Sequence, residues 1–151
     1  MADIEKLRPK TKELCKMFIA ECKKQGIDVI ITQTERSIDL QNAYYAQGRQ
    51  SLSVVNGKRN AVGLQPISEK ENKSTVTNAI GGSSPHNYGL AWDFVVLTNG
   101  KADWNNITLF KKCGEIAKSL SLDGYTLESG SDFKSFKDYP HVQMKGWKNY
   151  K

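Results

Sequence analysis

The sequence SSPHNYGLAWDF, at residues 83–94, holds a histidine and an aspartate seven residues apart, His86 and Asp93. Its apolar second half predicts a buried strand over residues 89–97. In one unbroken strand, residues seven apart face opposite sides, so a site shared by His86 and Asp93 needs a bend between them. Gly89 supplies that bend, because glycine adopts backbone angles that other residues avoid. We therefore expect His86 on a loop and Asp93 on the strand that follows.

A metal site is one explanation for an aspartate in an apolar strand, because a buried carboxylate is costly without a partner. The chain has only two histidines, and the second, His141, lies in KDYPHVQM at residues 137–144, three residues after Asp138. Two imidazoles and one carboxylate form a usual ligand set for catalytic zinc, and Asp138 is the nearest candidate for a general base. Each residue also has a plain structural interpretation: His86 as a loop histidine, Asp93 as the partner of a lysine, Asp138 as part of a turn.

Composition predicts one folded domain over residues 1–151, since 38% of the residues are hydrophobic and 25% are charged. The net charge of +6 favours polyanionic partners such as bacterial wall polymers, and we see no nucleic-acid-binding motif. No apolar run approaches the ~20 residues that span a bilayer, and the N-terminus lacks a stretch typical of a signal peptide. We therefore expect synthesis in the cytoplasm. The three cysteines lack CxxC spacing and are expected to be reduced and buried.

Periodicity predicts interleaved helices and strands. The first half of the chain is expected to form a helix over residues 3–25, a strand over 27–34, a helix capped by Ser37 and ended by Gly48, and a surface loop over 51–75. The second half is expected to form the strand described above and a helix over 105–120. Residues 124–144 are expected to be irregular chain and a final strand. Leu14, Phe18 and Cys22 are expected to share one face of the first helix, and Ile107, Phe110, Cys113 and Ala117 are expected near one face of the last. This pattern predicts an α+β fold with a small, largely antiparallel sheet flanked by helices.

Three segments together resemble one family. SSPHNYGLAWDF resembles the SxHxxGxAxD signature of the M15 zinc peptidases, which include D-alanyl-D-alanine carboxypeptidases and L-alanyl-D-glutamate peptidases. KDYPHVQM is similar to the family's second signature, a carboxylate shortly before a terminal histidine. ERSIDLQNAYYAQGR, at residues 35–49, resembles its arginine-bearing segment. The Asp-x-Pro-His form is typical of the branch from bacteriophage endolysins and sporulating bacteria, and the resemblance implies the Hedgehog and DD-peptidase type of fold.

The resemblance also implies roles for individual residues. His86, Asp93 and His141 would bind Zn²⁺. Asp138 would be the catalytic base, and Arg36 would hold the substrate carbonyl or stabilise the oxyanion.

Further residues have supporting roles by the same resemblance. Ser84 falls where the family has a serine that helps to bind substrate, and Gln41 would be structural or would support the site from behind. The chain has ESGSDF, at residues 128–133, where many relatives have a Trp-Gly-Gly-Asp run. Glu128 in that run is a second candidate for the base.

The function expected from these features is zinc-dependent hydrolysis of the L-alanyl-D-glutamate bond in the stem peptide of peptidoglycan. The chain would be a monomeric bacteriophage endolysin, or its catalytic module, that reaches the wall after the membrane is permeabilised. One alternative is a D-alanyl-D-alanine carboxypeptidase or dipeptidase of the same fold. Another is a wall-binding protein that has lost catalysis.

Overall fold

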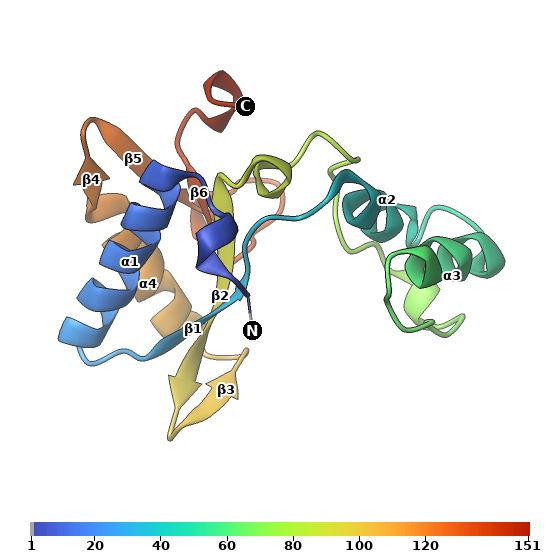
Figure 1. Ribbon diagram of the computed structural model, residues 1–151. Coiled ribbons are helices and arrows are strands. Elements are labelled where there is room, and N and C mark those ends of the chain that lie inside the picture. The colour runs from blue at the N-terminus through green and yellow to red at the C-terminus, as the bar shows by residue number, and fades with distance from the viewer. Residues whose placement is uncertain (1) are drawn as a thin grey trace. The chain divides into compact units, whose positions relative to one another are not determined.

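The computed structural model describes residues 2–151 and divides into two compact units (Figure 1). The first unit is formed by the chain up to Glu35 and from Tyr88 to Lys151, and the second by Arg36–Asn87. Among the described residues, no helix is both long and apolar enough to cross a membrane.

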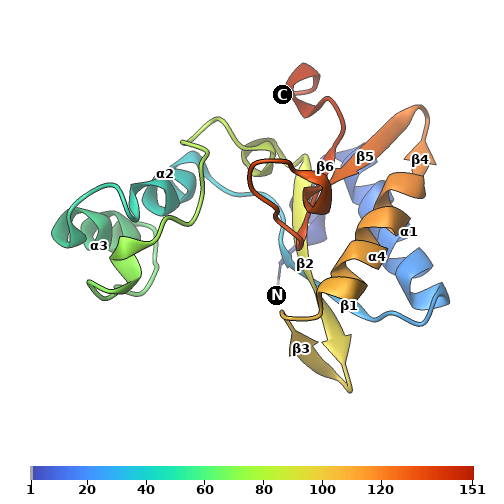
Figure 2. The same ribbon diagram turned by 180° about the vertical axis from the view of Figure 1, so that it is seen from behind.

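The first unit contains a six-stranded sheet with two α-helices packed on it (Figure 2). The helices are α1 (Pro9–Lys24) and α4 (Ile107–Ser119). The strands are β1 (Val29–Gln33), β2 (Ala91–Thr98), β3 (Lys101–Asp103), β4 (Ser121–Leu122), β5 (Tyr125–Ser129) and β6 (His141–Met144). Their order is β1-β2-β6-β5-β4, with β3 paired to β2, and every pairing is antiparallel. The predicted α+β fold with an antiparallel sheet is confirmed.

The hydrophobic core lies on one face of this sheet. In β2 and β6, Trp92 is the cross-strand partner of Val142, and both are fully buried. Phe18 of α1 packs on the same face, with ring centroids 5.6 Å from Trp92 and 5.0 Å from Phe94. Because side chains alternate along a strand, the residues next to Trp92 and Val142 point to the opposite face. Asp93 and His141 are two of those residues.

The first helix has the predicted buried face but begins later than predicted. Leu14, Phe18 and Cys22 are all fully buried. The α-helix starts at Pro9, after a short 3₁₀ turn at Ile4–Lys6. Proline suits the first helical position, because its backbone angle is preset and an N–H there has no partner within the helix. The prediction of reduced, buried cysteines is confirmed, since all three are free and buried.

The last helix matches its prediction except at Ile107. Asn106 caps α4 by accepting a hydrogen bond from the Leu109 N–H. Ile107 is 39% exposed, so the buried part of the predicted apolar face does not include it. It occupies the first position of the helix, and the buried side chains of α4 begin one turn later, at Phe110.

The strand β5 was missed, because residues 124–144 were predicted to be irregular chain with a single final strand. β5 pairs with β6 on one side and with β4 on the other. The turn between β4 and β5 is formed by Asp123 and Gly124, with φ angles of 52° and 86°. Asp-Gly is a strong signal for a tight hairpin turn, so the sequence did contain evidence for this strand.

The second unit is helical. It contains α2 (Ile38–Ala46), α3 (Leu52–Ala61) and a 3₁₀ turn at Glu71–Lys73. Ser37 caps α2 as predicted, because its hydroxyl accepts a hydrogen bond from the Leu40 N–H at 3.1 Å. Gly48 follows the helix with a φ of 81°, a left-handed conformation that favours glycine.

The predicted loop over residues 51–75 is wrong in its first half, where α3 lies. Ser51 caps this helix by accepting from the Val54 N–H at 3.4 Å. Val55 is the one residue of α3 that is buried. A helix with a single buried position has no apolar period, so the pattern could not reveal it.

Candidate active site

The pairing of β2 with β6 brings Asp93 and His141 together. They are direct cross-strand partners, so their side chains share one face of the sheet. Asp93 Oδ1 lies 3.1 Å from His141 Nδ1. The face opposite the hydrophobic core therefore carries an acid and an imidazole in contact.

His86 lies on the 3₁₀ helix η3 (Pro85–Tyr88). The second unit ends within this helix, at Asn87. Gly89 follows η3 with a φ of 68°, which is the bend that the sequence predicts before β2. A β-carbon at Gly89 would lie 3.1 Å from the Lys6 carbonyl oxygen, so the chain passes close to its N-terminal segment there. These constraints fix the backbone conformation at Gly89, just before β2 begins.

The three predicted metal ligands form one cluster. Each of His86, Asp93 and His141 offers a ligand atom, and these atoms all lie within 4.8 Å of one another. Both histidines are buried, whereas Asp93 is half-buried. Two imidazole nitrogens and one carboxylate oxygen fit the ligand set of a catalytic zinc ion, which leaves a fourth position for water or substrate.

The electrostatics of the cluster favour a positive charge next to His141. Burial opposes the charged imidazolium, but the hydrogen bond that it donates to Asp93 and the charges of Asp93 and Asp138 outweigh this effect, so the pKa of His141 is raised. Two carboxylates thus concentrate negative potential around one ring nitrogen. A bound cation would also be stabilised by this negative potential.

Asp138, the predicted base, lies beside this cluster. Its Oδ2 is 4.0 Å from His141 Nδ1, and its side chain is 42% exposed. The Asp138 N–H donates to the Gly130 carbonyl at 2.9 Å, and the Asp138 carbonyl accepts from the His141 N–H at 3.1 Å. The carboxylate is therefore held by its backbone at the edge of the cluster while it remains accessible to water.

Glu128, the second candidate for the base, is linked to His141 through another residue. Glu128 Oε2 accepts a hydrogen bond from Gln143 Nε2 at 2.8 Å. Gln143 Oε1 lies 2.8 Å from His141 Nε2, the ring nitrogen on the far side from Asp93. Gln143 was not predicted as a site residue. Its position two residues after His141 on a strand, and hence on the same face, was the available signal.

Comparison with known proteins identifies the chain. The profile of the VanY family, described as D-alanyl-D-alanine carboxypeptidase, matches residues 4–143. The chain is an M15 peptidase of the VanY family. It is accordingly an enzyme, as the signatures predict.

Relatives of this VanY-family chain include endopeptidases. CwlK of Bacillus subtilis (strain 168), a peptidoglycan L-alanyl-D-glutamate endopeptidase, is 35% identical over 153 residues, which cover 91% of this chain and 73% of CwlK. The L-Ala D-Glu endopeptidase ChiX of Serratia marcescens has a similar fold, with a TM-score of 0.55 at 16% identity over 99% of this chain and 93% of ChiX. The vancomycin-resistance D,D-pentapeptidase VanY, solved with Zn(II), gives a TM-score of 0.56 at 12% identity over 94% of this chain and 74% of that one.

Arg36 of the VanY-family chain is oriented within the second unit by its neighbours. Its Nη1 donates to Gln41 Oε1 at 2.8 Å, and its guanidinium lies 5.1 Å from the centre of the Tyr44 ring. Gln41 is fully buried and donates in turn to the Ala79 carbonyl at 2.7 Å. The Arg36 N–H donates to the His86 carbonyl at 2.8 Å. Arg36 and Gln41, two of the residues that the family resemblance singled out, are thus hydrogen-bonded to each other.

Ser84 is placed by the structure within the turn that holds His86. Its hydroxyl accepts a hydrogen bond from the His86 N–H at 3.3 Å, and it is 5% exposed. Asn87 accepts from the Ser84 N–H at 3.2 Å and donates to the Arg36 carbonyl at 3.0 Å. In this geometry the Ser84 hydroxyl stabilises the turn around His86.

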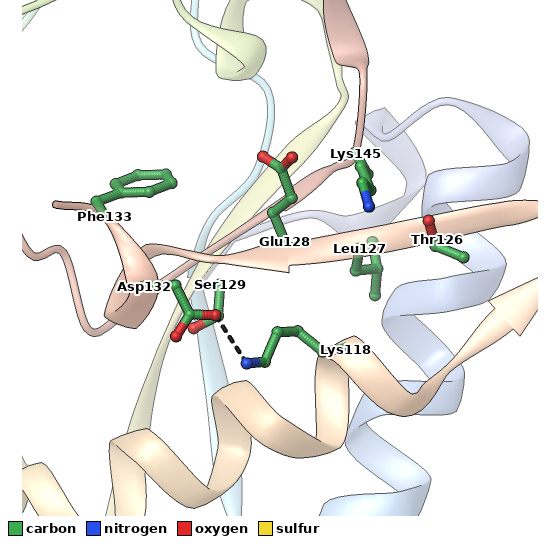
Figure 3. Close-up of a pocket in the computed structure, with 8 residues that line it drawn as sticks. All are labelled: Lys118, Thr126, Leu127, Glu128, Ser129, Asp132, Phe133 and Lys145. Atoms are coloured by element: carbon green, nitrogen blue, oxygen red, sulfur yellow. Dashed lines mark ion pairs between the residues drawn. The ribbon is translucent and has the colours of Figure 1, made fainter.

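A cavity of about 500 Å³ in the first unit lies along β5 (Figure 3). Phe133 and Glu128 form part of its wall, and the Phe133 ring is 5.8 Å from the His141 ring. Figure 3 shows the Glu128 carboxylate on the side of β5 away from α4, whereas Lys118 pairs with Asp132 on the α4 side. The volume is in the usual range of ligand-binding cavities.

Proposed function

We propose that this VanY-family chain is a zinc-dependent endopeptidase that hydrolyses the L-alanyl-D-glutamate bond of peptidoglycan. The observation that carries the proposal is the cluster of His86, Asp93 and His141 with the accessible carboxylate of Asp138 beside it. The choice of bond is supported by the 35% identity to an enzyme named for that activity.

The cluster residues would hold the zinc ion through two imidazole nitrogens and the Asp93 carboxylate. When bound, zinc lowers the pKa of a water molecule and polarises a carbonyl group. The burial of both histidines excludes bulk water from most of their surface, which strengthens electrostatic interactions at the site.

We assign to Asp138 the role of transferring protons during the reaction. Its carboxylate takes a proton from the attacking water and later gives it to the amine that leaves the cleaved peptide bond. The partial exposure of Asp138 suits this role, because the group must contact water and exchange protons with it.

We assign to Arg36 the role of stabilising the negative charge that develops on the carbonyl oxygen during attack. A guanidinium is always charged and donates from a rigid plane, so it suits an oxyanion or a substrate carbonyl. Its hydrogen bond to buried Gln41 restricts its rotamers before substrate arrives.

We also propose that the enzyme is a bacteriophage endolysin, made in the host cytoplasm and active on the wall after the membrane is permeabilised. The net charge of +6 supports an anionic polymer as substrate. Expression in a bacterial cytoplasm with and without a membrane-permeabilising agent tests this. Lysis only when the agent is present is expected, and lysis that is equal in both cultures would contradict it.

Digestion of purified peptidoglycan tests which bond is cut. The expected products carry new N-terminal D-glutamate or D-isoglutamine, with L-alanine left on the muramyl side. Labelling of new amino termini and mass spectrometry of the fragments would identify them.

A D-alanyl-D-alanine carboxypeptidase is the second candidate, because the matching family profile is described by that activity. Release of free D-alanine from wall fragments, with L-alanyl-D-glutamate bonds intact, would establish this alternative. Neither product would appear if the chain were a wall-binding protein without catalysis.

A further inference from the structure

Two hydrogen bonds link three side chains across the sheet, from Glu128 through Gln143 to His141. Glu128 and Gln143 are cross-strand partners in β5 and β6, and Gln143 lies two residues after His141 on the same face. The bond from Gln143 Nε2 to Glu128 Oε2 and the contact of Gln143 Oε1 with His141 Nε2 are both 2.8 Å long. His141 and Gln143 are buried, so water competes little with this network.

The direction of these hydrogen bonds follows from which groups can donate. An ionised carboxylate only accepts, so Gln143 must turn its NH₂ group toward Glu128. Its carbonyl oxygen then faces His141 and can only accept. His141 must therefore carry its proton on Nε2.

A neutral imidazole with its proton on Nε2 has a lone pair on Nδ1. Nδ1 lies 3.1 Å from an Asp93 oxygen and 4.0 Å from an Asp138 oxygen. A lone pair that faces two carboxylates is stabilised by a cation among them. The same tautomer therefore prepares Nδ1 to bind a metal ion.

We propose that Glu128 and Gln143 are positioning residues that fix the tautomer of His141 and so make Nδ1 its metal-binding atom. This inference rests on the proposed zinc site. It gives Glu128 a role in orienting a ligand, in place of the role as base that the sequence left open. Partners of this kind hold a histidine ligand in orientation and typically change metal affinity by about 10–100-fold when removed.

The tautomer can be read directly in the metal-free protein, without any substitution. The chain has only two histidines, so proton–nitrogen correlation spectra contain two imidazoles, and His86→Ala assigns them. At a pH where the ring is neutral, His141 is expected to carry its proton on Nε2. A proton on Nδ1 would overturn the proposal.

Zinc affinity, measured by competition with a chromophoric chelator, provides the second test. Gln143→Met keeps the length of the side chain but removes the strong acceptor, and its zinc affinity should fall about 10–100-fold. The double variant Glu128→Gln with Gln143→Glu rebuilds the relay, because Gln at position 128 donates to Glu at position 143, which accepts from His141. It should recover most of the affinity.

The outcomes separate this inference from the proposed function. Wild-type affinity in Gln143→Met, or no recovery in the folded double variant, would overturn the relay while the zinc site stands. A wild-type protein that binds no zinc would overturn both the zinc site and the assignment of Nδ1.

Discussion

The backbones of Gly130 and Asp138 are in such close contact that no side chain fits between them. A β-carbon at Gly130 would lie 2.0 Å from the Asp138 carbonyl oxygen, and the Asp138 N–H donates to the Gly130 carbonyl at 2.9 Å. Because His141 donates its own N–H to that Asp138 carbonyl, the contact fixes the proposed base relative to a proposed metal ligand.

Gly130→Ala should therefore displace Asp138 and reduce turnover while zinc remains bound. A misplacement of about 1 Å at a catalytic group can cost roughly 10²-fold in rate. The measurement is kcat on peptidoglycan together with zinc content. Gly57→Ala is the matched control, because nothing lies within 4 Å of a β-carbon there. Equal rates in the two variants would mean that the Gly130 contact does not set the position of the base.

Asp138→Asn removes the proposed base but keeps the size of the side chain. We expect turnover to fall about 10²–10⁴-fold with zinc content unchanged, since a general base typically contributes that much. Asp132→Asn controls for loss of an acid in the same segment, because Asp132 forms a solvent-exposed ion pair with Lys118. A near-normal rate in Asp138→Asn would assign the base to another residue.

The sequence predicted those structural features that depend on residues close along the chain, and the three expected metal ligands lie near one another in the structure. The bend at Gly89 and the capping of α2 by Ser37 depend on local backbone geometry, which residue types reveal. The partnership of Glu128 with Gln143 depends on the register between β5 and β6, which no local pattern determines. The helix α3 was hidden for the different reason that only Val55 of it is buried.

Zinc removal should destabilise the protein, because a ligand that binds only the folded state stabilises it. We expect about one zinc per chain by elemental analysis, and a lower Tm after treatment with a chelator that zinc restores. Asp93→Asn should lose the zinc and its effect on Tm. Asp103→Asn, on β3, should retain both, because it alters an acid that bonds to Thr98 at the surface. A chelator that changes neither Tm nor activity would count against the metal site.

Phe18→Ala should be strongly destabilising. The fully buried ring contacts Trp92 and Phe94, and its removal leaves a cavity between α1 and the sheet. We expect the free energy of unfolding of the zinc-loaded protein to fall by about 3–5 kcal/mol in urea titrations. Phe136→Ala is the control, since that side chain is 56% exposed and its loss should change stability little. Similar unfolding curves for both variants would contradict the assigned core.

Arg36→Ala tests the stabilisation of developing charge. Arg36 is held by Gln41 and lies over Tyr44, so its guanidinium is oriented before substrate binds. If it meets charge that exists only in the transition state, kcat should fall about 10²–10³-fold, with zinc content and KM nearly unchanged. Arg49→Ala is the matched control, because Arg49 also lies over a tyrosine ring, 3.9 Å from the centre of Tyr45, in the same unit. A rise in KM alone would show that Arg36 binds the ground state and transition state equally, as a substrate anchor does.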